Sequence, residues 1–165
     1  MLKKYSLILI AVLMFAACED ETVNETVDLD CEILGTLYEN NSASLDLRGK
    51  NLAVLPDCIG NLTNLTYLRL TNNQLTTLPE SIGDLTSLTY LRLTNNQLTT
   101  LPESIGNLTN LVTLDLSKNK LTTLPESIGN LTNLEYLYLF GNNFYFSDAD
   151  KAKIQSWLPN CYIIW

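Results

Sequence analysis

The four cysteines carry the most reactive side chains of this 165-residue chain, and their surroundings limit the chemistry open to it. The sequence contains no histidine. This excludes a Ser-His-Asp or Cys-His catalytic site, a histidine-ligated metal and a histidine pH switch. No two cysteines have the close spacing of a zinc site, so we expect no metal and no cofactor. Acylation and disulfide formation remain as roles for Cys18, Cys31, Cys58 and Cys161.

Carboxylates are plentiful, but their pattern does not indicate catalysis. The 18 Asp and Glu residues outnumber the 10 Lys and Arg residues, which gives a net charge of −8. This acidic balance argues against nucleic acids and anionic lipid surfaces as partners. Glu80, Glu103 and Glu126 recur at one spacing, which is typical of a solvated face. We therefore predict no catalytic residues and a protein that is not an enzyme.

Residues 1–17 have the pattern of a signal peptide. Lys3 and Lys4 precede an unbroken apolar run, residues 7–17, which is too short for a transmembrane helix but fits a signal-peptide h-region. The run ends in Phe15-Ala16-Ala17-Cys18, which resembles a bacterial lipobox, where the cysteine is lipidated and becomes the new N-terminus. We expect lipidation of Cys18; ordinary cleavage nearby, which leaves Cys18 unmodified, is the alternative.

Residues 18–30 form an acidic segment that we expect to be a flexible tether. Glu19, Asp20 and Glu21 directly follow Cys18, and this cluster resembles the surface-export signal of lipoproteins in some Gram-negative lineages. Together with the lipid anchor, the segment predicts an exported lipoprotein of the outer membrane or cell surface.

A repeat of 23 residues occupies most of the remaining chain. Residues 65–83 read LTYLRLTNNQLTTLPESIG, and residues 88–106 repeat them letter for letter. Each unit contains L-x-x-L-x-L-x-x-N-x-L, and over residues 44–144 the chain resembles the leucine-rich repeat family. The resemblance implies an α/β fold, a short right-handed horseshoe whose parallel β-sheet forms the concave face. We also expect a structural asparagine ladder at Asn73, Asn96, Asn119 and Asn142.

The two ends of the solenoid are expected to carry helical caps. Residues 31–43 place Ile33, Leu34, Leu37 and Tyr38 on one helical face, which predicts an N-terminal cap helix. Residues 145–165 predict a C-terminal cap, a helix with Ser147 as its N-cap followed by a final strand. Such caps cover exposed leucine edges, so we expect a monomer.

Stacking of the expected coils brings the N-terminal cap close to the first convex segment. Cys31 lies in the former and Cys58 in the latter, at a position where later units carry serine. We predict a Cys31–Cys58 disulfide, with three free thiols as the alternative. Cys161 lies at the other end of the solenoid and is expected to be a buried free thiol.

Alternate residues of each expected strand point to the concave surface. Tyrosine and arginine, which are enriched in interface hot spots, line up there across neighbouring units. We therefore expect a non-enzymatic module that binds a macromolecule, most plausibly a protein. Sugar rings stacked on Tyr67, Tyr90 and Tyr136, or a structural envelope protein without a ligand, are the alternatives. The candidate binding residues are Tyr67, Arg69, Tyr90, Arg92, Asp115, Tyr136 and Tyr138.

Overall fold

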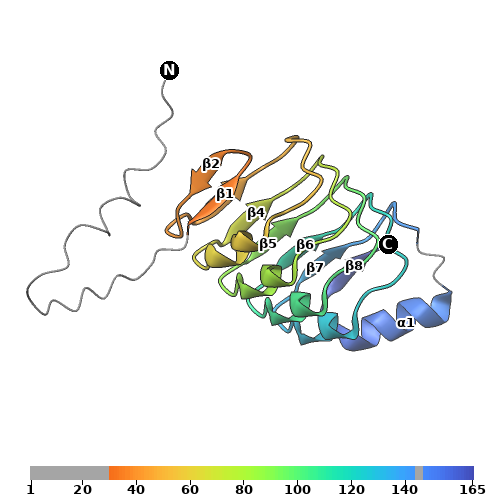
Figure 1. Ribbon diagram of the computed structural model, residues 1–165. Coiled ribbons are helices and arrows are strands. Elements are labelled where there is room, and N and C mark those ends of the chain that lie inside the picture. Colours follow the sequence, from red (N-terminus) through yellow and green to blue (C-terminus); the bar gives the residue numbers. More distant parts are fainter. Residues whose placement is uncertain (1–29, 144–146) are drawn as a thin grey trace, which may run out of the picture.

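Each 23-residue unit forms one coil of a solenoid, with a short strand on one side and a 3₁₀ helix on the other (Figure 1). The computed structural model describes residues 30–143 and 147–165, so the predicted signal peptide, Cys18 and almost all of the tether lie outside it. The parallel sheet runs in the order β3 (Ser44–Asp46), β4 (Tyr67–Arg69), β5 (Tyr90–Arg92), β6 (Thr113–Asp115), β7 (Tyr136–Tyr138) and β8 (Tyr162–Ile164).

The sequence period sets the register of this sheet. Tyr67 pairs with Tyr90, Leu68 with Leu91 and Arg69 with Arg92, so equivalent residues of successive units lie side by side. The leucine of each pair is fully buried, while its two neighbours point to the opposite face. One coil has too few leucines to shield its own core, but each coil covers the next and forms a continuous apolar interior.

The 3₁₀ helices form the opposite wall and lie in a row in Figure 1. They begin after a proline in extended conformation, as Pro79 does with φ −69° and ψ 153°. A Cβ on Gly83 would lie 2.5 Å from the Ser104 carbonyl oxygen, so close packing of the next coil requires glycine there. The four helices are η1 (Asp57–Asn61), η2 (Glu80–Asp84), η3 (Glu103–Asn107) and η4 (Glu126–Asn130).

The asparagine column connects each coil to the one before it. The Oδ1 of Asn96 accepts a hydrogen bond from the Leu75 N–H at 3.1 Å. Its Nδ2 donates to the carbonyl oxygens of Leu70 and Leu93, both at 2.9 Å. Asn73, Asn119 and Asn142 make equivalent bonds. The side chains thus satisfy buried backbone groups where each coil leaves its strand.

The N-terminal cap is a β-hairpin, so the predicted helix over residues 31–43 is wrong. Strands β1 (Cys31–Ile33) and β2 (Thr36–Tyr38) pair antiparallel. Leu34 and Gly35 between them have φ values of 53° and 76°, and a two-residue turn of this kind reverses the chain. Burial alternates along β1 with a period of two, and Leu34 and Leu37 are exposed. The hairpin is fastened to η1 by the Cys31–Cys58 disulfide, which agrees with the predicted pairing.

At the other end the solenoid is closed by a helix and a strand. Helix α1 (Asp148–Trp157) starts with a capping box in which the Ser147 side chain accepts from the Asp150 N–H. Trp157 packs against Gly129 of the last 3₁₀ helix, and β8 then adds the sixth strand to the sheet. Within residues 30–143 and 147–165, no helix has the length and apolar character needed to cross a bilayer.

Candidate binding surface on the concave face

The register of the sheet arranges the concave side chains in rows. The first row is Ser44, Tyr67, Tyr90, Thr113, Tyr136 and Tyr162. The second row is Asp46, Arg69, Arg92, Asp115, Tyr138 and Ile164. Arg48 and Ser117 belong to a third row, two residues further along their chains. The structure thus brings all seven predicted binding residues onto one face of the sheet.

The first coils hold a charge cluster around Asp46. Arg48 Nε lies 3.0 Å from both carboxylate oxygens, and Arg69 Nη1 lies 3.6 Å from Oδ2. Desolvation acts to raise the pKa of Asp46, but the hydrogen bonds from Arg48 and the two guanidinium charges outweigh it and hold the pKa below its ordinary value. The carboxylate is therefore ionised at neutral pH and neutralises part of the charge of both arginines.

Arg69 is further fixed by the tyrosine of its own strand. Its guanidinium donates to the Tyr67 hydroxyl and lies 5.1 Å from the Tyr67 ring centroid. Tyr67 in turn packs against Tyr90, with ring centroids 5.9 Å apart and planes tilted by 43°. This cluster is ordered before any partner arrives, which lowers the entropy cost of binding.

Arg92 stands in the same sequence context as Arg69 but in different surroundings. Within the part of the chain that the structure describes, its guanidinium makes no hydrogen bond or ion pair. Asp115, its cross-strand neighbour, instead accepts from the backbone N–H and the hydroxyl of Ser117. Arg92 is therefore the concave arginine whose donors are all available to a partner.

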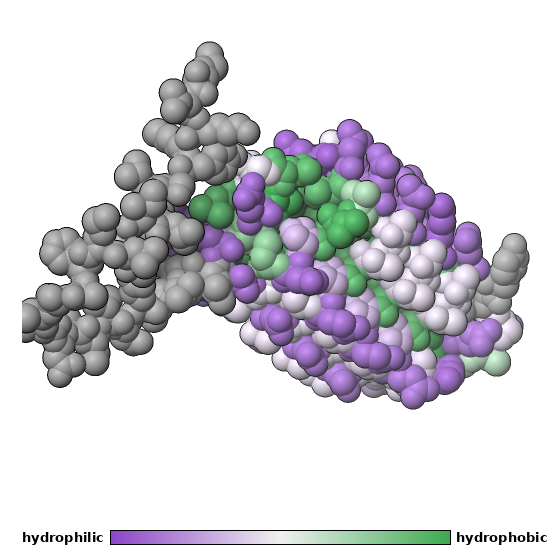
Figure 2. Space-filling view, viewed as in Figure 1, coloured by the Kyte–Doolittle hydropathy of each residue, from purple (hydrophilic) through white to green (hydrophobic). Residues whose placement is uncertain are grey.

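The last two strands present aromatic side chains. Tyr136 and Tyr162 in the first row are 42% and 66% exposed, and Phe140 beyond β7 is 39% exposed. Sequence reasoning did not place Tyr162 in the binding set, although the alternation of the predicted final strand would have found it. Elsewhere in the described chain the exposed large hydrophobic residues are Tyr90 on β5 and Leu34, Leu37 and Val54 in the hairpin and first coil. Figure 2 shows hydrophobic side chains gathered towards that end.

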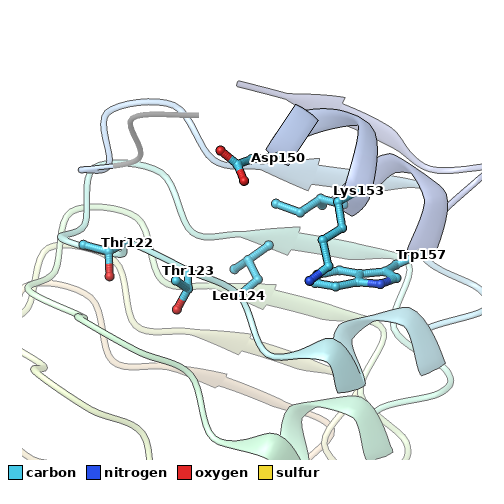
Figure 3. Close-up of a pocket in the computed structure, with 7 residues that line it drawn as sticks. Thr122, Thr123, Leu124, Asp150, Lys153 and Trp157 are labelled. Carbon is cyan, nitrogen blue, oxygen red and sulfur yellow. The ribbon is translucent and has the colours of Figure 1, made fainter. Parts of the chain in front are cut away.

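A separate hollow of about 230 Å³ lies between the last coil and α1 (Figure 3). Its two charged groups already have protein partners. Lys153 Nζ lies 3.4 Å from Glu126 and 5.1 Å from the Trp157 ring centroid, and Asp150 belongs to the capping box. We therefore assign this hollow to the packing of the cap and not to a binding site.

The remaining reactive groups do not form a second site. Cys161 is a free, buried thiol, and burial raises its pKa to about 11. Among the described residues there is no group of three or more Cys, Asp or Glu side chains that could hold a metal ion.

Two neighbouring units differ only in the segment that holds the concave strand, whereas the units of β4 and β5 have identical strands. Residues 98–111 and residues 121–134, which include the 3₁₀ helices, are identical letter for letter. The preceding strand segments, residues 89–97 and 112–120, share only the two core leucines and the ladder asparagine. Exposed positions such as Thr99 and Thr122 belong to the identical part, so exposure alone does not explain where the units differ.

The comparisons with known proteins agree with this geometry. Residues 41–98 match the family described as leucine rich repeat, and residues 81–145 match the family described as leucine-rich repeat region. The structure has the same features, a parallel sheet of repeated strands opposite a row of 3₁₀ helices. The chain is therefore a leucine-rich repeat protein with the predicted solenoid fold.

Two solved structures illustrate the similarity. A leucine-rich repeat protein of Leptospira interrogans, LIC12759, is 34% identical, with a TM-score of 0.64 over 76% of this chain and 38% of its own. An internalin, inlF, of Listeria monocytogenes is 29% identical, with a TM-score of 0.56 over 67% of this chain and 31% of its own. The chain thus spans well under half of either structure. The search of curated proteins found no match.

Proposed function

We propose that this protein is an exported, lipid-anchored binding module without enzymatic activity, which recognises a protein partner through its concave face. The observation that carries the proposal is the difference between the two neighbouring units. Their framework and outer segments, residues 98–111 and 121–134, are identical, while the concave strand segments differ at every position outside the core and the asparagine ladder. Diversity at a surface held by a constant scaffold is what a recognition surface requires.

The residues that would contact the partner are Tyr67, Arg69, Tyr90, Arg92, Asp115, Tyr136 and Tyr138. Tyrosine offers a large contact area at a small cost in side-chain entropy, and arginine adds directed hydrogen bonds. The side chains of these residues alternate away from the leucine core. Substitutions there should change binding and leave folding nearly intact.

A protein partner accounts for this surface better than a sugar does. Stacking on a sugar ring needs an accessible flat aromatic face. Tyr67 packs against Tyr90 at a 43° tilt and has Arg69 beside its ring, so its faces are already in use. Carbohydrate binding at Tyr67, Tyr90 and Tyr136 is therefore the second candidate, and a structural envelope protein without a ligand is the third.

The proposed location depends on residues outside the described part of the chain. The apolar run of residues 7–17 and the Phe15-Ala16-Ala17-Cys18 sequence favour export and acylation of Cys18. The Cys31–Cys58 disulfide suits an oxidising compartment. An outer-membrane or cell-surface lipoprotein combines these features.

The anchor is tested by Cys18→Ala. We expect this variant to be released from the membrane fraction or to remain an uncleaved precursor, as followed by fractionation and intact-mass spectrometry. Cys161→Ala is the matched control, since that thiol lies in the folded domain and should not affect partitioning. Maturation and membrane partitioning like the parent would overturn acylation at Cys18.

The concave face is tested by crosslinking on intact cells. The double variant Tyr90→Ala, Arg92→Ala should lose protein crosslinks that the parent forms, while Glu103→Ala on the outer wall should keep them. A glycan array probed with the same proteins addresses the second candidate. Equal crosslinks from the parent and the concave double variant would contradict the proposed binding face.

A further inference from the structure

The distribution of arginine divides the concave face into two unlike halves. The chain has three arginines, Arg48, Arg69 and Arg92, and all three lie in the concave rows of β3, β4 and β5 or directly after them. The rest of this acidic chain uses lysine for its positive charges. The guanidinium group is the cation that binds a carboxylate through two parallel hydrogen bonds, so its placement here indicates anion recognition.

The two aspartates of the same rows leave one positive charge uncompensated. Asp46 is shared between Arg48 and Arg69, with the closest approach at 3.0 Å to Arg48. Asp115 accepts from Ser117, and no ion pair joins it to Arg92 in the described structure. Three arginines against two aspartates leave one positive charge for a single anionic group, and Arg92 is the arginine whose guanidinium makes no hydrogen bond or ion pair among the described residues.

The cationic half continues into an open hollow of about 570 Å³ at the edge of the sheet. The hollow is lined by Asp46, Arg48, Gly49, Lys50 and Asn72. The ammonium group of Lys50 has no ion pair among the described residues. A segment that reaches from Arg92 towards this edge therefore meets a second positively charged group.

The other half is apolar and aromatic. The concave rows on β7 and β8, with the residue that follows β7, carry no charged side chain. They consist of Tyr136, Tyr138, Phe140, Tyr162 and Ile164. Thr113, a small residue that is 8% exposed, lies between Tyr90 and Tyr136 in the first row and marks the boundary between the halves.

We propose that the partner presents an extended segment with a carboxylate side chain at one end and aromatic or aliphatic side chains at the other. The carboxylate binds Arg92, and the apolar end packs on Tyr136 and Tyr162. Arg92 on β5 and Tyr162 on β8 lie three strand spacings of about 4.8 Å apart, or about 14 Å, which corresponds to about four residues of extended chain, so a seven-residue peptide is long enough to make both contacts. This inference rests on the proposed concave-face function and adds the chemistry of the partner.

A random seven-residue peptide library on phage, selected on the purified mature protein, tests the proposal without knowledge of the natural partner. We expect enrichment of Asp or Glu at one end and of Phe, Tyr, Leu or Ile at the other. The peptide that binds best is then synthesised with a fluorescent label, and its Kd is measured by anisotropy. A version with Gln or Asn in place of its acidic residue serves as the partner mutation.

The double-mutant cycle gives the decisive measurement. Arg92→Gln should raise the Kd of the acidic peptide by about tenfold or more, and the amide version should lose as much on the parent protein. When Arg92→Gln is combined with the amide version of the peptide, the Kd should rise no further than with either change alone. Arg92→Lys should restore part of the affinity, and Lys153→Gln, which removes an exposed charge on α1 away from the concave rows, should leave the Kd unchanged.

The outcomes separate this inference from the function on which it rests. If selected peptides lack acidic residues, or if the two losses simply add, the proposed carboxylate contact is wrong. Loss of binding by Tyr136→Ala in that case would keep the concave face as the binding site. If neither Arg92→Gln nor Tyr136→Ala changes the Kd, the concave-face function fails as well. Absence of any enriched peptide, or binding of an acidic glycan in its place, overturns a peptide partner.

Discussion

Between the units of β5 and β6, the outer wall and the concave strands have changed to very different extents, whereas the units of β4 and β5 keep identical strands. Residues 98–111 recur unchanged as residues 121–134, whereas the strand segments before them retain only their core leucines and ladder asparagine. Both regions carry exposed side chains, so tolerance of substitution should be similar at many positions. This contrast supports the proposal that the wall acts as a fixed support and that the strands contact the partner.

The packing explains why much of the support is constrained. A Cβ on Gly106 would lie 2.5 Å from the Ser127 carbonyl oxygen, and Asn96 bonds to three backbone groups of two coils. A change at such a position disturbs the next coil as well as its own. Concave side chains such as Tyr90 and Arg92 are exposed and lack this constraint. Substitutions in the support should therefore change stability, and those on the strands should change binding.

The largest effect on stability is expected from loss of the Cys31–Cys58 disulfide. Cys58→Ser introduces the residue that later units carry at this position, so its main consequence is removal of the crosslink. The closed loop corresponds to about 3 kcal/mol of unfolding free energy. Urea denaturation of both proteins measures the difference, with the parent in reducing agent as the second reference. Equal midpoints for oxidised parent and variant would contradict this estimate.

The second largest loss of stability is expected when a buried asparagine of the ladder is replaced. Asn96→Ala leaves the Leu75 N–H and two carbonyl groups without their partner, at a cost of roughly 1–3 kcal/mol. Thermal unfolding compares it with Thr99→Ala, an exposed control from the same coil, which should lie within about 0.5 kcal/mol of the parent. Unchanged stability of Asn96→Ala with lost binding would instead assign the ladder to the recognition surface.

Close approach of the coils gives a third test of the support. Gly106→Ala forces the backbone of Ser127 to move, and overpacking of this kind costs about 1–3 kcal/mol. The matched change Gly129→Ala places the new Cβ 3.3 Å from Trp157 Cβ and 3.5 Å from the Trp157 carbonyl oxygen, and it should cost less because these contacts are longer. Denaturation midpoints of the two variants decide the order, and a greater loss at Gly129 would show that the cap packs more tightly than the coils.

The sequence predicts the solenoid well because one pattern recurs in every unit. A unit whose own residues are ambiguous can therefore be assigned by alignment with its neighbours. The N-terminal cap has no such repetition. In residues 31–38 a short apolar run fits a helix or a strand equally well, and the turn at Leu34 and Gly35 decides for the hairpin. The candidate site was predictable as a set of rows. The difference between Arg69 and Arg92 was not predictable, because residues 65–83 and 88–106 are identical and the preceding coil supplies Asp46 to Arg69 and not to Arg92.

The smallest effect on folding, and the one that tests the comparison most directly, is expected on the strands. The double variant Tyr90→Ala, Arg92→Ala removes two exposed side chains that make no contribution to the leucine core. Its unfolding free energy should stay within about 0.5 kcal/mol of the parent. Binding of the selected seven-residue peptide should weaken by about tenfold, or 1.4 kcal/mol, in an anisotropy titration. Glu103→Ala on the outer wall should change neither quantity. If the outer-wall variant loses peptide binding while the concave double variant binds like the parent, the constant wall is the binding surface. The roles assigned here to the wall and the strands would then be reversed.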